Sequence, residues 1–263
     1  MSDRRPTPKT VTVLRTQRLS ESLVRLVVGG DSLADFDPIH ADSYVKVCFD
    51  GGTENADGAG RPRMRTYTVR TFDPAARELT LDFVVHGDSG LAGPWAAAAQ
   101  VGDEVRLLGP GGGYSPSAEA DWHLLAGDES ALPAIAAALE RLPEGAVAHA
   151  FVEVHGPGDE IELATGAGTT VSWLHRGTGA VGSRLVEAVT EWEPPAGEGQ
   201  WFVHGEAGVV KALRRYLRLE LGVPMSQLSI SGYWRLGVDD EGWRAVKREW
   251  NQELEDAERA VAS

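Results

Sequence analysis

The sequence predicts a two-domain protein: an N-terminal antiparallel β-barrel of six strands in Greek-key order, then an α/β domain with a parallel sheet and a C-terminal helix. The chain has 263 residues, enough for two domains of ordinary size. Its first part contains short runs of alternating apolar and polar residues separated by turns. After about residue 120 the pattern changes to strand, helix, strand.

The predicted barrel domain spans residues 8–114. Six segments have the alternation and flanking turns of strands with one solvated face. In chain order they are KTVTVLRTQ, SLVRLVVGG, SYVKVCFDGG, MRTYTVRTF, ELTLDFVVHG and DEVRLLGPGGGY. Six short strands of this kind are typical of a closed antiparallel barrel. The glycine-rich segment 109–117 is interpreted as a linker, and residues 50–60 as a hairpin loop.

The predicted α/β domain spans residues 120–255. DWHLLAGDESALPAIAAALERLP is interpreted as a strand, a turn with Ser130 as helix N-cap, and a helix stopped by Pro143. Two strands (AVAHAFVEV and TTVSWLHR), a helix (GSRLVEAVTEWEPP) and a strand-turn-helix unit (WFVHGEAGVVKALRRYLRLELG) follow, before a charged amphipathic C-terminal helix. Such alternation predicts a mostly parallel sheet with helices on both faces.

Composition and charge argue against several functional classes. The formal net charge of −14 disfavours binding to nucleic acid or to anionic membranes. There is no apolar run of about 18 residues, and MSDRRPTPKT lacks the apolar stretch of a secretory signal, so we expect a cytoplasmic protein without membrane insertion. The single cysteine, Cys48, excludes an intrachain disulfide and cannot supply an iron–sulfur cluster. No metal site is expected, because these histidines lack metal-ligand spacing: His86, His123, His149 and His204.

The segment RMRTYTVR, residues 63–70, places cationic and hydroxyl side chains on one predicted strand. The strand period puts Arg65 and Tyr67 on the same face. This pair suits a flavin nucleotide, because a guanidinium forks onto a pyrophosphate while a phenol ring lies against the isoalloxazine. Thr68 would then offer its hydroxyl or its amide to the edge of the flavin ring. The alternative is a surface strand whose arginines are merely solvated.

A second phosphate-binding element follows the next predicted strand. In HGDSGLAGPWAAAA, the small residues Gly87, Gly90, Ala92 and Gly93 would let backbone amides approach a pyrophosphate closely. A helix beginning near Gly93 would add the positive end of its dipole. An ordinary glycine-rich turn is the alternative, but two complementary elements in succession favour one shared diphosphate.

Five ordered motifs carry a resemblance to a known family: RTYTVRTFDP, LDFVVHGDSGLAGPWAAAAQVGD, LAGDESALPAI, FVHGEAGVVKALRRYL and SGYWRLGVDDEGW. Together they resemble the siderophore-interacting proteins, FAD-containing ferric-siderophore reductases within the ferredoxin–NADP reductase superfamily. The resemblance runs from about residue 10 to residue 250. It implies FAD on the barrel domain and NADPH or NADH on the α/β domain.

The resemblance also implies the residues of the flavin site. Arg65 would hold phosphate, Tyr67 would stack on the flavin, and Thr68 would bond near its reactive nitrogen. Tyr67 and Thr68 are therefore the implied catalytic residues. The full set implied for the cofactor is Arg65, Tyr67, Thr68, Val69, His86, Gly87, Gly90, Leu91, Ala92 and Trp95. In GLAGPW the proline comes later than in the family pattern, which is a small departure.

On the nucleotide side, the implied residues lie at the ends of predicted strands, where α/β sheets bind ligands. They are Gly127, Asp128, Glu129, Ser130, Ala131, Gly205, Glu206, Tyr233 and Trp234. This half has no G-x-G-x-x-G fingerprint, as the superfamily resemblance leads us to expect. The C-terminal tryptophans resemble the family's pattern, and their alternative role is packing: Trp234, Trp243 and Trp250.

The choice between NADPH and NADH stays open in the sequence. Four basic residues of this half could bind a 2′-phosphate and would then favour NADPH: Arg176, Lys211, Arg214 and Arg215. The alternative is that these side chains are solvated, as arginines on helices usually are.

A ferric siderophore is the substrate that the resemblance implies, and no nucleic-acid partner is expected. Because such chelates are often anionic, an acidic protein needs local cations to bind one. Lys46 lies on a predicted barrel strand, and Arg244 and Lys247 are three residues apart on the last helix, so those two share a face. The resemblance implies that these three residues bind substrate. The alternative is ordinary salt bridging with residues 239–241.

The implied reaction passes electrons from NAD(P)H through FAD to the Fe(III)-siderophore and releases Fe(II) for use in the cell. A flavin is needed because a hydride carries two electrons whereas Fe(III) accepts one. Two alternatives stay open: a general NAD(P)H-flavin oxidoreductase, and a non-catalytic siderophore-binding protein. The sequence leaves the oligomeric state open, and a monomer is the simplest expectation.

Overall fold

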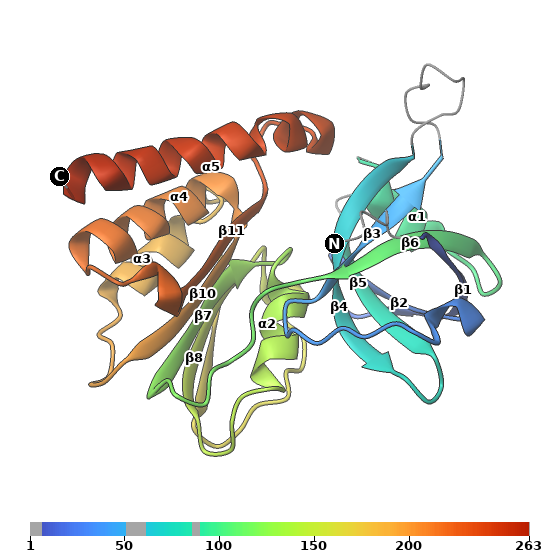
Figure 1. Cartoon of the computed structure of the whole chain (residues 1–263), viewed down its shortest axis with the longest axis horizontal. Coiled ribbons are helices and arrows are strands. Elements are labelled where there is room, and N and C mark those ends of the chain that lie inside the picture. The colour runs from blue at the N-terminus through green and yellow to red at the C-terminus, as the bar shows by residue number, and fades with distance from the viewer. Residues whose placement is uncertain (1–6, 51–61, 86–89, 263) are drawn as a thin grey trace, which may run out of the picture. The chain divides into compact units, whose positions relative to one another are not determined.

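The structure, a computed structural model, describes residues 7–50, 62–85 and 90–262 (Figure 1). It divides into two compact units, Met1–Ser115 and Pro116–Ser263. Each unit has its own sheet and its own apolar core.

Within its described residues, the first unit is a closed barrel of six antiparallel strands in the order β1-β2-β5-β4-β3-β6. The strands are β1 (Lys9–Arg18), β2 (Leu23–Gly29), β3 (Tyr44–Phe49), β4 (Arg63–Asp73), β5 (Glu78–Val84) and β6 (Glu104–Gly111). Their alternate valine, leucine and phenylalanine side chains fill the barrel, because successive residues of a strand point to opposite faces. The predicted six-stranded barrel is confirmed.

In the described part of the first unit, a 3-10 turn and a short α-helix accompany the barrel. The 3-10 turn η1 (Asp31–Leu33) follows β2, and α1 (Ala92–Ala98) precedes β6. Helix α1 begins one residue before the predicted start near Gly93, and its Ala92 and Ala96 pack into the barrel core.

The segment predicted as a linker is largely part of the barrel. Gly109 and Gly111 belong to β6, and Tyr114 is buried. The Asp42 carboxylate accepts hydrogen bonds from the amides of Gly113 and Tyr114, both at 2.8 Å. The linker prediction is therefore wrong for residues 109–114. A run of glycines indicated flexibility, but a distant aspartate fixes their backbone.

The second unit has a parallel five-stranded sheet in the part of the chain that is described, in the order β11-β10-β7-β8-β9. The strands are β7 (Trp122–Asp128), β8 (Val147–Val154), β9 (Thr169–His175), β10 (Gly199–Glu206) and β11 (Leu228–Trp234). The predicted parallel sheet is confirmed. The edge strand β11 was not predicted, because LSISGYW lacks the apolar run of its neighbours.

Helices cover both faces of this sheet, as predicted (Figure 1). Helix α2 (Leu132–Leu139) lies on one face, and α3 (Ser183–Glu191) and α4 (Ala207–Arg215) pack on the other. Short turns complete the unit: η2 (Pro157–Asp159), the π-helical η3 (Tyr216–Glu220) and η4 (Met225–Gln227). The predicted N-cap role of Ser130 is wrong. Ala131 occupies the N-cap position of α2 without a side-chain bond, while Ser130 donates from both its amide and its hydroxyl to Asp128.

The C-terminal helix α5 (Asp240–Ala262) packs on α4. Trp243 and Trp250 are buried against it with ring centroids 5.3 Å apart, so the packing alternative holds for these two tryptophans. Near the other end of the helix, Glu258 forms ion pairs with Arg214 and Arg218. Among the helices in the described ranges, none combines the length and apolar character needed to cross a membrane.

Candidate functional site

Strand β4 places the predicted flavin-binding side chains on one face. In its register with β3, Arg65 lies opposite Val47 and Tyr67 lies opposite Val45. The shared face predicted for Arg65 and Tyr67 is therefore confirmed. Arg65 is half-buried, and its guanidinium donates to the carbonyl of Met64 at 3.0 Å.

An aromatic cluster lies behind the Tyr67 ring. The Tyr67 and Phe83 ring centroids are 4.1 Å apart, and Trp95 on α1 packs edge-to-face on both Phe83 and Phe49. Phe83 is fully buried, whereas Tyr67 and Trp95 are only partly buried. The cluster holds two partly exposed aromatic rings on a rigid base.

The next two residues of β4 face different surroundings. Thr68 is 8% exposed and pairs with Tyr44, while the Val69 side chain lies in the barrel core. The Val69 amide donates to the carbonyl of Ser43 at 2.7 Å, so this N–H is already used within the barrel.

The start of α1 brings backbone close to β5. Gly90 has a φ of 87°, a left-handed conformation that favours glycine, and Leu91 is the N-cap residue. A Cβ atom on Gly93 would lie 3.0 Å from the Val84 carbonyl, so a larger residue would push the helix away. His86 and Gly87, the first predicted residues of the phosphate turn, lie outside the described residues.

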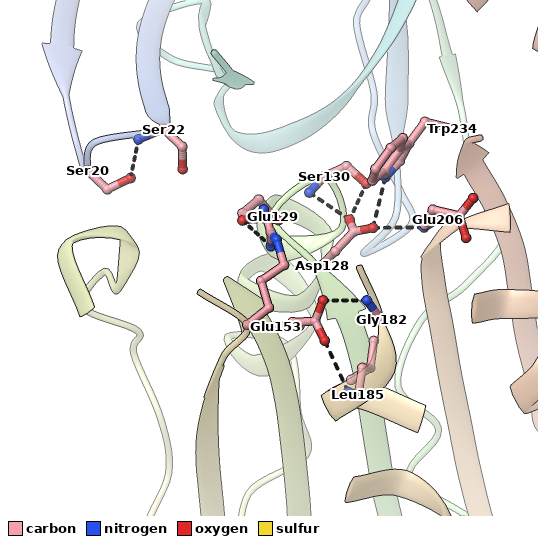
Figure 2. Close-up of polar contacts among 11 residues, drawn as sticks. Ser20, Ser22, Asp128, Glu129, Ser130, Glu153, Gly182, Leu185, Glu206 and Trp234 are labelled. Carbon is pink, nitrogen blue, oxygen red and sulfur yellow. Dashed lines mark hydrogen bonds and ion pairs between the residues drawn. The ribbon is translucent and has the colours of Figure 1, made fainter. Parts of the chain in front are cut away.

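In the second unit, hydrogen bonds to the Asp128 carboxylate link its own strand to two others at the carboxyl edge of the sheet (Figure 2). Its Oδ1 accepts bonds from the amide and hydroxyl of Ser130, at the end of its own strand β7. Its Oδ2 accepts the Glu206 amide of β10 and the Trp234 indole N–H of β11, both at 2.8 Å. The side chain is buried, and all four donors converge on this one carboxylate.

Two further carboxylates cap helices at this edge, and Figure 2 shows the bonds of one of them, Glu153. Glu206 is the N-cap of α4, where one oxygen accepts the amides of Gly208 and Val209 and the other accepts the Leu236 amide at 3.0 Å. Fully buried Glu153 accepts the amides of Gly182 at 2.6 Å and Leu185 at 3.2 Å. Carboxylates are favoured at helix N-termini, where backbone N–H groups lack partners. Glu153 was not predicted from the sequence, although a glutamate within the apolar run of β8 was a signal for it.

Glu129 and Arg176 form a buried ion pair at 2.6 Å between the ends of β7 and β9. Burial raises the pKa of Glu129, and Arg176 opposes that shift. Arg214 is buried and paired with Glu258. Arg176 and Arg214, two of the four residues considered for binding a 2′-phosphate, are thus held in ion pairs within the fold. The other two, Lys211 and Arg215, are exposed on α4.

The remaining predicted nucleotide-side residues lie at the same carboxyl edge. Ala131 is buried, and Ser130 is half-buried. Gly205 has a φ of 138° and lies against Asp128, where a Cβ atom would come within 2.7 Å of the carboxylate. Tyr233 and Trp234 are both half-buried at the end of β11.

The predicted substrate-binding cations lie on two elements. Lys46 is half-buried on β3, where it pairs with Thr66 and Leu108. On α5, Arg244 lies 3.8 Å from Asp240, as the salt-bridge alternative predicted. Lys247 is different: its ammonium donates to the Ser231 hydroxyl at 3.3 Å, and burial lowers its pKa.

Comparison with known proteins gives consistent matches. Residues 50–114 match the siderophore-interacting FAD-binding domain, and residues 120–237 match the siderophore-interacting protein family. The ferric vibriobactin reductase ViuB of Vibrio cholerae is 32% identical, over 90% of this chain and 92% of its own. The NADPH-dependent ferric-chelate reductase of Escherichia coli is also 32% identical, over 85% of this chain and 91% of its own. The chain belongs to the siderophore-interacting protein family.

Solved structures of the family have the same fold. The crystal structure of the siderophore-interacting protein SipS from Aeromonas hydrophila matches 94% of this chain and 99% of its own, with a TM-score of 0.83 and 31% identity. The barrel of the present chain is the FAD-binding domain of a siderophore-interacting protein, so FAD is its cofactor.

The described barrel residues fit this cofactor. A dinucleotide needs an aromatic or apolar wall for the flavin ring and cations or amides for its diphosphate. In this family member, the partly exposed Tyr67 ring on its aromatic base would supply such a wall. The guanidinium of Arg65 and the first amides of α1, which no helical carbonyl can satisfy, would supply the donors.

Proposed function

We propose that this protein is a ferric-siderophore reductase that takes electrons from NADPH, or alternatively NADH, and reduces the Fe(III) of a bound siderophore to Fe(II). The observation that carries the proposal is the joint face of β4, where Arg65 lies beside Tyr67 and the Tyr67 ring packs on buried Phe83. The ferric reductases among its relatives support the same reaction class. The expected cytoplasmic location and monomeric state stay predictions.

The barrel residues have separate roles in this proposal. Arg65 and the first amides of α1 bind the diphosphate of FAD, together with the turn that contains Gly90 and Leu91. Tyr67 contacts the flavin ring, and Thr68 lies beside it on the strand. When bound, FAD accepts a hydride and passes on single electrons, which matches a two-electron donor to a one-electron acceptor.

The nicotinamide nucleotide is proposed to bind at the carboxyl edge of the α/β sheet. Strands β7 and β10 are neighbours there although their chain connections leave in opposite directions, and such switch points bind ligands in α/β sheets. The half-buried Ser130, Tyr233 and Trp234 lie at this edge. Asp128 and Glu206 act indirectly, because their carboxylates already accept bonds from the framework.

Lys46 in the barrel unit and, separately, Arg244 and Lys247 in the α/β unit are proposed as cations that contact the substrate. In a protein of net charge −14, an anionic chelate is repelled by the overall field, so its binding depends on local cations. Among the described residues, Lys247 has only the neutral Ser231 hydroxyl as a hydrogen-bond partner. In this proposal the siderophore already coordinates the iron. Reduction therefore requires contact between the protein and the chelate, but no protein ligand to the metal.

Replacing Lys247 with methionine is expected to stabilise the protein at neutral pH while weakening ferric-siderophore binding. Methionine keeps the apolar stem but removes a charge that burial disfavours. The pKa of Lys247 is lower in the folded than in the unfolded chain, so between these two values the unfolded chain binds more protons. The charged Lys247 ammonium therefore lowers the stability of wild type at pH 7, and wild type regains this stability as pH rises. The stability advantage of Lys247→Met over wild type should shrink accordingly.

Thermal unfolding of Lys247→Met and wild type at pH 7 and at alkaline pH measures this difference. Lys211→Met, at an exposed lysine of α4, is the matched control and should change the melting temperature little at either pH. A Lys247→Met variant that is less stable than wild type at pH 7 would show that the ammonium is a net structural contact.

The proposed function is tested by the visible spectrum of the purified protein under anaerobic conditions. We expect a yellow flavin spectrum that bleaches with NADPH, bleaches less readily with NADH, and recovers when a ferric siderophore is added together with an Fe(II)-trapping chelator. A reduced flavin that free flavins and dyes reoxidise faster than any ferric siderophore would indicate a general flavin oxidoreductase. A colourless protein that FAD cannot reconstitute would leave only the non-catalytic binding protein.

A further inference from the structure

The end of β11 contains an extra residue. Strands β10 and β11 pair one to one from Trp201 opposite Leu228 to Gly205 opposite Gly232, but Glu206 then pairs with Trp234. Tyr233 is thus inserted into the ladder. Such a bulge bends a strand and redirects its side chains, and bulges are frequent next to functional sites.

Both aromatic side chains at this bulge have their polar atoms fixed by buried groups. The Trp234 indole N–H donates to Asp128, and the Tyr233 hydroxyl lies 2.8 Å from Nδ1 of His204. The His204 and Tyr233 rings meet edge to face, with centroids 5.1 Å apart. The hydroxyl of Tyr233 therefore already has a hydrogen-bond partner within the protein.

His204 is well suited to hold this hydroxyl in place. It is 4% exposed, its ring stacks on Phe202 at 3.8 Å, and its Nε2 lies 2.9 Å from the Ser229 hydroxyl. Burial lowers its pKa to about 3, so the imidazole is neutral in the working range and has one donor and one acceptor nitrogen. Serine and tyrosine hydroxyls can both donate and accept, so both nitrogens are satisfied in either tautomer.

We propose that His204 is a positioning residue for the nicotinamide nucleotide: it holds Tyr233 so that the ring, and not the hydroxyl, contacts the bound ligand. This inference rests on the proposed function, which places that nucleotide at the carboxyl edge of the sheet. A tyrosine whose hydroxyl is bonded to a buried imidazole loses little rotational freedom on binding, which favours affinity. His204 itself does not touch the ligand.

Tyr233→Phe and Ser229→Ala form a matched pair, because each removes one hydroxyl partner of the same imidazole. The measured quantity is the Kd of NADP⁺ for the oxidised, FAD-loaded protein by calorimetry. We expect Tyr233→Phe to weaken binding about 3- to 10-fold, the effect of one lost hydrogen bond, and Ser229→Ala to leave it within about 2-fold. His204→Phe, which keeps the stack on Phe202, should match Tyr233→Phe, and the double variant should be no weaker than His204→Phe.

Kinetics separate positioning from a general structural effect. The KM for NADPH should rise in Tyr233→Phe and His204→Phe, while the KM for Fe(III)–EDTA and the FAD content stay at the wild-type level. Equal Kd values for Tyr233→Phe and Ser229→Ala, or additive losses in the double variant, would overturn the inference. If His204→Phe does not fold, the matched pair decides alone. Wild-type protein that binds no NADP⁺ would overturn both the inference and the nucleotide site of the proposed function, whereas normal wild-type binding with an unaffected Tyr233→Phe overturns only the inference.

Discussion

Replacing Asp128 with alanine is expected to lower the free energy of unfolding of the α/β unit by about 3 kcal/mol or more. Four donors lose their acceptor at once: two belong to Ser130 in the turn after β7, and the other two come from the distant strands β10 and β11. Because the site is buried, water can replace only part of the lost hydrogen bonding, and each unsatisfied buried donor costs about 1 to 3 kcal/mol. Urea unfolding followed by tryptophan fluorescence measures the loss.

Asp121→Ala is the matched control for this prediction. Asp121 precedes the same strand and also accepts a backbone amide, that of Glu198 at 2.7 Å, but it is exposed to water. Its removal should cost less than about 1 kcal/mol. Asp128→Asn should be intermediate, because it keeps one carbonyl oxygen but turns an N–H group toward existing donors. Equal losses for Asp121→Ala and Asp128→Ala would show that the four contacts of Asp128 are not a structural junction.

The barrel and most of the sheet could be predicted because their side chains repeat with the period of a strand. Strand β11 has a weaker pattern: its alternate residues on one face are Ser229, Ser231 and Tyr233. Their hydroxyls are satisfied by His204 and Lys247, which come from β10 and α5. Polar residues become suitable for a sheet when such distant partners are present, and a local pattern contains no information about them.

The candidate site shows the same division. The period of two was enough to place Arg65 and Tyr67 together, because both lie on one uninterrupted strand. The sequence also placed Asp128 and Glu206 at strand ends. It could not indicate that an Asp128 oxygen accepts the indole N–H of Trp234, more than one hundred residues away. Nor could it indicate that a Glu206 oxygen accepts the amide of Leu236, about thirty residues away. The sequence predicted Ser130 as a helix cap, but Ala131 occupies that position, and the amide and hydroxyl of Ser130 donate to Asp128.

Replacing Arg65 with alanine is expected to weaken FAD binding about 10- to 100-fold, which corresponds to the loss of a charge-assisted pair of hydrogen bonds. Arg65 provides a positive charge beside Tyr67 in a protein whose net charge of −14 opposes a diphosphate. Titration of the FAD-free protein with FAD, followed by flavin fluorescence, measures the Kd. Arg65→Lys should lie between alanine and wild type, because lysine keeps the charge but not the fork.

Arg106→Ala is the control for the loss of any barrel arginine, because Arg106 is exposed on β6 and pairs with Asp50. Its FAD affinity should stay near that of wild type. The dependence of FAD affinity on ionic strength distinguishes two physical roles for Arg65. If its guanidinium binds the diphosphate, the difference in FAD affinity between Arg65→Ala and wild type should become smaller at high ionic strength, because screening weakens charge interactions. If the Arg65 stem mainly supports the Tyr67 ring by packing, the difference should not change with salt, and the phosphate role would be wrong.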